Sequence, residues 1–364
     1  MKVQDIIEVL EANAPLSLQE SYDNAGLIVG DRNSSLNGVL LCIDSTEDII
    51  DEAIEKGCNM VIAHHPIIFS GLKKINGSSY IERVIIKAIK HDIAIYASHT
   101  NLDKVYKNGV NSMISEKLGL QNTRILSPEK GHLFKLVNYV PPLHKNNVME
   151  ALYSAGAGEI GEYAKCSFSS KGEGTFLPLE NARPFIGEKG VMQTEQEEKV
   201  EVLVQSNKLR NVLQAMHQSH PYEEVAHYVI PVENEHQNIG LGMVGELKEE
   251  MKVVDFLNLL KLKFDLPQIR HTNYSKKIKK VAVCGGSGSY LFNEVSLCNA
   301  DAYVTADIKY HQFFDPEDDF LLADIGHYES EKFTMELFHR LISEKFPTFA
   351  VLFTDRNSNP VNYF

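Results

Sequence analysis

The sequence predicts an α/β protein into which a smaller α+β domain is inserted. Short apolar runs alternate with amphipathic segments over the first 120 residues, and the same alternation restarts near residue 250. A stretch of different character lies between these two parts. Alternating strands and helices at this spacing are typical of parallel sheets with helical crossovers. With 364 residues and roughly 150 residues per domain, the chain holds about 2.4 domains' worth of polypeptide.

The first part of the chain begins with a helix and continues with buried strands. Residues 3–13 carry apolar side chains on one side and stop before Pro15, which predicts a helix. The apolar runs 38–43, 59–63 and 93–97 are short and continuous. Such runs are typical of strands that are buried on both faces of a parallel sheet.

Helix signals lie between these strands. Thr46 is a candidate N-cap, Glu47 and Asp48 follow it in the first turn, and Gly57 marks the C-terminal end. A further helix is expected at 80–91.

The C-terminal part repeats the pattern as a second α/β unit. We expect helices at 251–264, 290–299 and 328–345, and strands at 279–284, 302–306, 320–325 and 349–353. Comparable strands of the two parts end in polar residues, in VIAHHP and in YVTADIKYH. This indicates either a duplication or two halves that face each other across one site.

The middle of the chain has the element order β-α-β-β-α-β, which is the ferredoxin-like arrangement. The expected strands are 132–141, 163–170, 198–205 and 224–232, and the expected helices are 144–156 and 207–218. A Gly- and Glu-rich stretch in its centre predicts an exposed hairpin or loop. We therefore expect residues 1–126 and 241–364 to form one α/β domain and residues 127–240 to form an inserted domain.

Composition excludes several classes of protein. The 36 basic and 49 acidic residues give a net charge of −13, which opposes binding of a nucleic acid by bulk charge. The sequence has no run of 18 apolar residues, so we expect no membrane-spanning helix. The N-terminus lacks the features of a signal peptide. The five cysteines are odd in number and scattered, so a disulfide framework is not expected. A reducing cytoplasm is the expected location.

The strongest local signal is the pair His64 and His65, followed by Pro66, directly after the strand 59–63. Ligands of open α/β sheets gather at the carboxyl ends of strands. Two adjacent histidines at such a turn can point both imidazoles into one crevice. The alternative is that one ring packs in the core while the other is merely solvated.

Two further strands end in similar residues. Asp103 follows the strand 93–97. The alternative is that Asp103 is simply the N-cap of a helix and binds no metal. His327 and Glu331 follow the strand 320–325 and are four residues apart, so on a helix they share one face. The alternative for this pair is an ordinary solvated helix start.

Taken together, these strand ends predict a metal centre. Imidazoles and carboxylates suit Zn, Mn, Fe, Co or Ni. A single catalytic zinc typically takes three protein ligands. Two metals about 3.5–4 Å apart, which share a bridging carboxylate, would use a larger set. We therefore expect a dinuclear site with five ligands: His64, His65, Asp103, His327 and Glu331.

The motifs AHHPIIF, SHTNLD, YDNAGLIVG, TADIKYH and DIGHYESE resemble the Nif-three-like family, also called type 2 homologues of GTP cyclohydrolase I. The resemblance spans essentially the whole chain. It implies an α/β protein with two metal ions, held by the same five residues. Residues 219–231 resemble the PII/CutA-like insert of longer bacterial members. The resemblance also implies a homohexamer, assembled as a trimer of dimers. Many members of the family have Trp at the position where this chain has Tyr22.

Other residues of these motifs are secondary candidates. His99 and His311 are expected to orient ligands, to contact substrate as catalytic residues, or only to pack. The segment CGGSGSY (284–290) could hold a phosphate with backbone amides, but a tight turn explains it equally simply. His220, Glu223 and Glu224 are expected to be structural or to lie at a subunit contact.

Two functions fit the sequence. The first is a metal-dependent hydrolase, for which the resemblance suggests GTP or a related purine, attack at the imidazole ring carbon and release of formate. His99 or His311 would then protonate the leaving nitrogen. The second is a non-catalytic metal-binding oligomer of regulatory or chaperone-like type, whose insert responds to a partner or small molecule. Turnover of a panel of nucleotides, phosphoesters and amides distinguishes the two.

Overall fold

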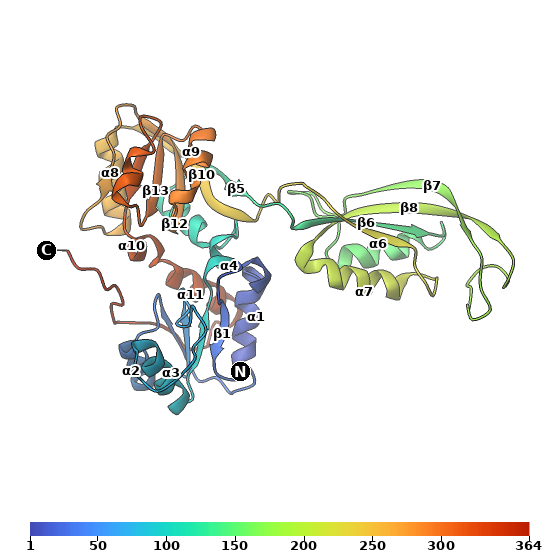
Figure 1. Ribbon diagram of the computed structural model, residues 1–364, viewed down its shortest axis with the longest axis horizontal. Helices are drawn as coiled ribbons and strands as arrows, with labels where there is room; N and C mark the ends of the chain where they lie inside the picture. The colour runs from blue at the N-terminus through green and yellow to red at the C-terminus, as the bar shows by residue number, and fades with distance from the viewer. Residues whose placement is uncertain (364) are drawn as a thin grey trace. The chain divides into compact units, whose positions relative to one another are not determined.

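The computed structural model describes residues 1–363 and confirms the predicted α/β fold class (Figure 1). Contacts within the chain divide it into two compact units. Unit 1 comprises residues 1–128 and 238–363, and unit 2 comprises Glu129–Gln237.

The first sheet of unit 1 has the strand order β1-β4-β3-β2-β15. Its bounds are β1 Gly26–Val29, β4 Ala94–Ala97, β3 Met60–Ala63, β2 Val39–Cys42 and β15 Val351–Phe353. The predicted strands β2, β3 and β4 are parallel neighbours, whereas β1, which was not predicted, pairs with β4 in the antiparallel direction.

Strand β15 corrects one expectation, because we placed residues 349–353 in the second α/β unit. In the structure β15 pairs in parallel with β2, and Val351 lies opposite Val39. The preceding helix, α11 (Thr334–Lys345), contacts both α1 (Val3–Asn13) and β2. It therefore returns the chain to the first sheet.

The second sheet has the strand order β11-β14-β13-β12-β10-β5. Its bounds are β11 Arg270–His271, β14 Leu321–Asp324, β13 Ala302–Ala306, β12 Ile278–Ser287, β10 Gly240–Met251 and β5 Gln121–Pro128. The strands β12, β13 and β14 are parallel, and the other three pair in the antiparallel direction. Strands β5 and β10 were not predicted.

Helices cover both sheets of unit 1 and fill the space between them. The remaining helices are α2 Glu47–Glu55, α3 Tyr80–Lys90, α4 Thr100–Asp103, α5 Val110–Leu118, α8 Val253–Phe264, α9 Phe292–Leu297 and α10 His327–Glu331, with short 3-10 turns η1 Leu16–Leu18, η3 Ser289–Leu291 and η4 Tyr310–Phe314. As predicted, Thr46 caps α2 by accepting a hydrogen bond from the Ile49 amide. The helix expected at 328–345 is divided into α10 and α11.

The core of unit 1 follows from the alternation of side chains along each buried strand. In β2, Val39 and Leu41 join a core cluster that includes residues of α1, α5, α8, α11 and both sheets. Leu40 and Cys42 point to the opposite face and pack with apolar residues of α2 and α3. The two sheets of unit 1 therefore share one inner core, and this arrangement fixes the carboxyl ends of their strands.

Unit 2 has the element order β-α-β-β-α-β. Its elements are β6 Leu133–Val140, α6 Lys145–Ser154, β7 Ser167–Phe176, β8 Gln193–Gln205, η2 Ser206–Lys208, α7 Leu209–Ser219 and β9 His227–Pro231. Its antiparallel sheet has the order β7-β8-β6-β9, and β7 and β8 form a long hairpin through the Gly- and Glu-rich stretch. The likeness of this unit to PII and CutA proteins stays a prediction.

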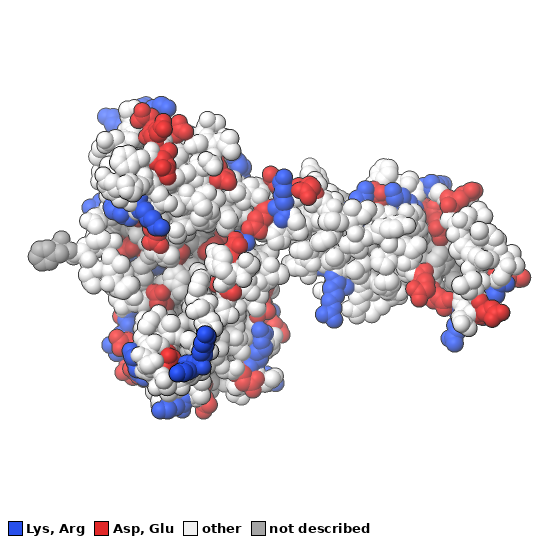
Figure 2. Space-filling view, viewed as in Figure 1, with Lys and Arg blue, Asp and Glu red and all other residues white. Residues whose placement is uncertain are grey.

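None of the helices formed by residues 1–363 is long and apolar enough to cross a membrane. Figure 2 shows that Lys and Arg lie in small scattered groups among Asp and Glu on the face drawn. Among the described residues the five cysteines are free thiols.

Candidate metal centre

The predicted ligands reach one place in unit 1 from both of its sheets. His64 and His65 follow the last residue of β3, and Asp103 ends α4, which begins just after β4. Because β3 and β4 are parallel neighbours, their carboxyl ends meet at one edge of the first sheet. Helix α10, which follows β14 of the second sheet, begins with His327 and ends with Glu331.

One group of ligand atoms surrounds Oε1 of Glu331. Nε2 of His64 lies 3.6 Å from this oxygen and 3.7 Å from Oδ1 of Asp103. Both His64 Nε2 and Asp103 Oδ1 are buried and have no hydrogen-bond partner. An unpaired buried nitrogen and an unpaired buried carboxylate oxygen are costly unless something binds between them.

A second group surrounds the other oxygen of the same carboxylate. Nε2 of His65 lies 3.0 Å from Glu331 Oε2, and Nε2 of His327 lies 3.1 Å from it. The two imidazole nitrogens are 3.3 Å apart. Each oxygen of Glu331 thus faces its own group, which is the disposition of a carboxylate that bridges two cations. Within the described chain, His64, His65 and Glu331 form the group whose ligand atoms lie within 4.8 Å of one another.

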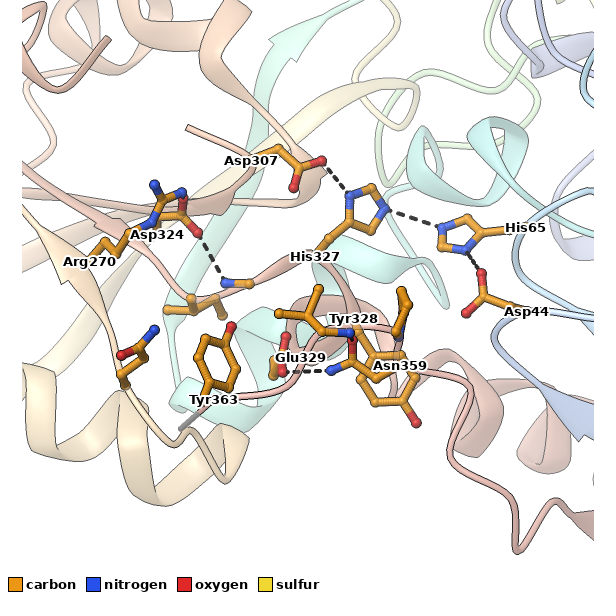
Figure 3. Close-up of a pocket in the computed structure, with 15 residues that line it drawn as sticks. Asp44, His65, Arg270, Asp307, Asp324, His327, Tyr328, Glu329, Asn359 and Tyr363 are labelled. Atoms are coloured by element: carbon orange, nitrogen blue, oxygen red, sulfur yellow. Dashed lines mark hydrogen bonds and ion pairs between the residues drawn. The ribbon is translucent and has the colours of Figure 1, made fainter. Parts of the chain in front are cut away.

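The opposite ring nitrogen of each histidine has its own acceptor. Nδ1 of His64 lies 2.8 Å from the carbonyl oxygen of Ser98. Figure 3 shows the corresponding contacts of the other two rings, from His65 to Asp44 and from His327 to Asp307, each at 2.7 Å.

These acceptors determine which ring nitrogen carries the proton. Carbonyl and carboxylate oxygens accept hydrogen bonds, so Nδ1 donates to them, and in the neutral ring Nε2 is left to offer its lone pair to a metal. This orientation by carboxylates and carbonyls is the usual second layer of a histidine metal site.

Electrostatics in the centre favour positive charge. Burial lowers the pKa of His65, but hydrogen bonds to Asp44 and Glu331 outweigh burial and raise it to about 9. Burial also lowers the pKa of His327, yet hydrogen bonds to Asp307 and Glu331 outweigh burial and raise it to about 11. Burial raises the pKa of Asp103. The buried carboxylates and imidazoles therefore bind protons strongly. The same negative surroundings suit the binding of metal cations, which would replace these protons.

The structure explains the glycine-rich segment as a wall of this centre. The Gly285 amide donates to Oδ1 of Asn111, and the Gly286 amide donates to the hydroxyl of Ser330, each at 2.9 Å. Both amides are therefore occupied by the protein itself. In the structure residues 284–287 are the end of β12, and the turn that we considered is limited to the 3-10 turn η3 that follows.

His99 lies beside the ligands, and an acidic residue holds it. Its Nδ1 is 2.8 Å from Oδ1 of Asp23, and Oδ2 of the same carboxylate accepts hydrogen bonds from the Thr100 amide and hydroxyl. Burial raises the pKa of Asp23, but bonds to His99 and Thr100 lower it to about 2. Asp23 is thus a carboxylate acceptor, and Nε2 of His99 is left for other contacts.

The other candidates have local contacts of their own. His311 is exposed on η4, where its ring contacts Tyr310, and it lines neither cavity beside the ligands. His220 in unit 2 accepts from the Tyr222 amide and contacts the carbonyl oxygen of Tyr139, so both ring nitrogens serve the local fold. Glu223 accepts from the Arg183 amide.

Two cavities approach the centre. One of about 450 Å³ is lined by Asp44, His65, Asp307 and His327 among others (Figure 3). The other, of about 810 Å³, is lined by His99, Asp103 and Glu331 as well as by His65 and His327. His65 and His327 line both cavities. A small molecule in either cavity can therefore reach the partly exposed rings of His65 and His327, whereas His64 Nε2 and Asp103 Oδ1 are buried.

Sequence reasoning missed the residues that orient the imidazoles. Asp44 is separated from the end of β2 by Ile43 alone, and Asp307 directly follows Ala306, the last residue of β13. The signal available was the same one that identified His64 and His65, namely a polar residue at the carboxyl end of a buried parallel strand.

Comparisons with known proteins agree over nearly the whole chain. The profile of the Duf34/NIF3 family (NGG1p interacting factor 3) matches residues 1–360. A Halalkalibacterium halodurans protein named GTP cyclohydrolase 1 type 2 homolog is 43% identical over 327 residues, or 89% of this chain and 88% of that protein. The Bacillus subtilis protein of the same name is 42% identical over 336 residues, or 92% and 90%.

The structural comparison extends this agreement to the fold. The crystal structure of a Bacillus cereus protein related to NIF3 superposes with a TM-score of 0.87 at 37% identity. The match covers 100% of this chain and 99% of that one.

Proposed function

This chain belongs to the Duf34/NIF3 family, and on that premise we propose that it is a metal-dependent hydrolase with a dinuclear centre. One observation carries the proposal: the two oxygens of Glu331 face two separate groups of ligand atoms. His64 and Asp103 lie on one side, and His65 and His327 lie on the other.

The donor set narrows the metals that would be held. Three imidazoles and two carboxylates suit Zn, Fe, Mn, Co or Ni, and no thiolate is needed. When bound, such a pair would supply Lewis acidity and would lower the pKa of a water molecule toward about 7. Catalytic sites keep a coordination position open for water or substrate, and the cavities beside this centre give access to it.

The protein's own contribution to proton transfer is assigned to His99. Because Asp23 accepts the Nδ1 proton of His99, Nε2 can take up or release a proton toward the cavity. His99 lines the same cavity as Asp103 and Glu331, so this proton is delivered beside the ligands. Asp23 acts by keeping the ring oriented.

The names of the relatives support a purine substrate. The curated relatives are named homologues of GTP cyclohydrolase 1 type 2. We therefore include in the proposal the hydrolytic opening of a purine imidazole ring with release of formate, in which His99 would protonate the leaving nitrogen.

Turnover tests the proposal directly. Purified protein loaded with Zn, Mn, Fe, Co or Ni is incubated with purine nucleotides, nucleosides and phosphoesters, and formate and phosphate are measured. We expect release that requires metal and is abolished in Glu331→Gln. A fully metal-loaded protein without turnover of any compound would refute hydrolysis and would favour the non-catalytic metal-binding alternative.

A further inference from the structure

The larger cavity beside the ligands is lined by exposed aromatic rings. Tyr22, Phe69 and Tyr290, which we call the aromatic wall, all line it. Their exposed fractions are 62%, 52% and 56%. Large aromatic side chains that stay exposed inside a cavity are costly to hydrate and are ready to contact a ligand.

Two of these rings are neighbours, and one of them also contacts His99. The centroids of Tyr22 and Phe69 lie 6.1 Å apart with their planes tilted by 43°, and Phe69 contacts the ring of His99 edge-on at 6.1 Å. Because His99, Asp103 and Glu331 line the same cavity, a flat ligand stacked on either ring would lie in the cavity that reaches the proposed metal ligands.

The same cavity lacks the side chains that usually hold a polyphosphate. Its lining includes the carboxylates of Glu20, Asp103 and Glu331, and no Lys or Arg is among these lining residues, all of which the structure describes. Lys104 lies behind the lining, where its Nζ contacts Glu20 Oε1 at 2.8 Å. Phosphate groups are normally held by Arg, Lys or unused backbone amides.

The nearest glycine-rich segment does not offer such amides at Gly285 or Gly286, because both donate to side chains of the protein. The cavity does offer acceptors. Glu20 and the exposed hydroxyl of Ser287 line it, and both can accept hydrogen bonds from ring N–H groups.

From these observations we infer that the cavity binds an uncharged planar nitrogen heterocycle, as the free base or nucleoside, stacked on one of the rings of Tyr22 and Phe69 and in edge contact with the other. The inference rests on the proposed function, since it places the reacting ring beside the metal ligands. It narrows the substrate class, because the lining of this cavity offers no Lys or Arg to a triphosphate chain.

Binding of guanosine tests this inference. The chain contains no Trp, so Tyr22→Trp introduces a single fluorescent reporter into the aromatic wall. We expect guanosine to quench this indole in the full-length protein. Calorimetry should show that Tyr22→Leu and Phe69→Leu each weaken guanosine binding on the order of tenfold, the loss typical of one base–aromatic stacking contact.

Tyr80→Leu is the matched control, because Tyr80 is 56% exposed and lines neither cavity beside the centre. It should leave guanosine binding unchanged. In chelator-treated protein, GTP should bind no more tightly than guanosine. GTP binding that is tenfold tighter under these conditions, or unchanged affinity in Phe69→Leu, would overturn the inference.

Metal content separates this inference from the proposed function. Phe69→Leu should bind as much metal as the unaltered protein. The ring of Phe69 contacts the rings of Tyr22 and His99, and neither of these residues is a proposed ligand. If metal binding and turnover hold while guanosine does not bind, the inference fails alone. If guanosine binds but no compound is hydrolysed, the proposed function fails and the binding site stands.

Discussion

At the scale of single residues, the Cβ atom that Gly286 lacks would lie 2.4 Å from Oε1 of Glu331 and 3.3 Å from Cε1 of His327. Gly286 also has a φ of 62°, a conformation that side chains rarely adopt. We predict that Gly286→Ala displaces Glu331 and loses metal, as elemental analysis of the folded protein would show.

Gly57→Ala provides the matched control, because Gly57 has a φ of 69° but no atom within 4 Å of an added Cβ. It carries the backbone cost without the clash. Equal metal content in the two variants would show that the close approach to Glu331 does not matter.

His99→Gln separates proton transfer from metal binding. The amide keeps a polar group of similar reach but cannot titrate. We predict near-normal metal content and a kcat lowered on the order of 10²–10⁴-fold, as expected for loss of a general acid. Steady-state kinetics with His91→Gln, an exposed histidine at the end of α3, provide the comparison. Normal kcat in His99→Gln on a true substrate would remove His99 from the mechanism.

The five proposed ligands could be predicted because each follows, or nearly follows, a buried strand whose carboxyl end lies at the site. Their partners are harder to recognise. The contact from His65 to Asp44 joins residues 21 positions apart, and the contact from His99 to Asp23 joins residues 76 apart. A lone aspartate after a strand is equally consistent with a helix cap, so sequence alone does not reveal which imidazole it will meet.

At the scale of elements, the parallel strands were predictable because both of their faces are buried and their sequences are continuously apolar. Strands β5 and β10 both mix polar, charged and apolar residues, and β10 also includes three glycines, so their pattern resembles that of a loop. Helices α10 and α11 form one continuous amphipathic pattern in sequence, yet the structure interrupts it at Lys332 and Phe333.

Residues of the segment after β15 line the smaller cavity. The backbone amide of Asp355 donates to Glu52, and the Ser358 hydroxyl donates to Asp44 at 3.0 Å. Figure 3 shows the side-chain amide of Asn359, which donates to Glu329 at 3.0 Å. Since Asp44 also holds His65, this segment is one contact away from a proposed ligand.

We therefore predict that deleting residues from 358 onward accelerates loss of metal to a chelator by about tenfold, because partners of metal ligands typically change affinity by about 10–100-fold. The release is followed with a metal indicator. Asn362→Ala, which alters an exposed residue of the same segment, serves as control. An unchanged release rate in the deletion would show that the segment does not support the site.

At the scale of the whole molecule, both ends of the chain form unit 1. The chain passes from β5 into unit 2 and returns to unit 1 at β10. Pro128 at the end of β5 lies opposite Gly240 at the start of β10. Removing residues 129–237 and joining Pro128 to Asn238 with a short Gly-rich linker should therefore leave unit 1 folded, with its metal content unchanged. Insoluble or metal-free protein would show that unit 1 depends on unit 2.

The expected homohexamer stays a prediction that sedimentation of the full chain would test.

We propose that residues from both ends of the chain form one dinuclear centre. Elemental analysis of the unaltered protein, His65→Ala and Glu331→Ala tests this proposal, with circular dichroism to confirm folding. We expect two divalent metals per chain in the unaltered protein and a clear loss in each variant, although 266 positions separate the two residues. Full metal content in either folded variant would contradict the shared centre.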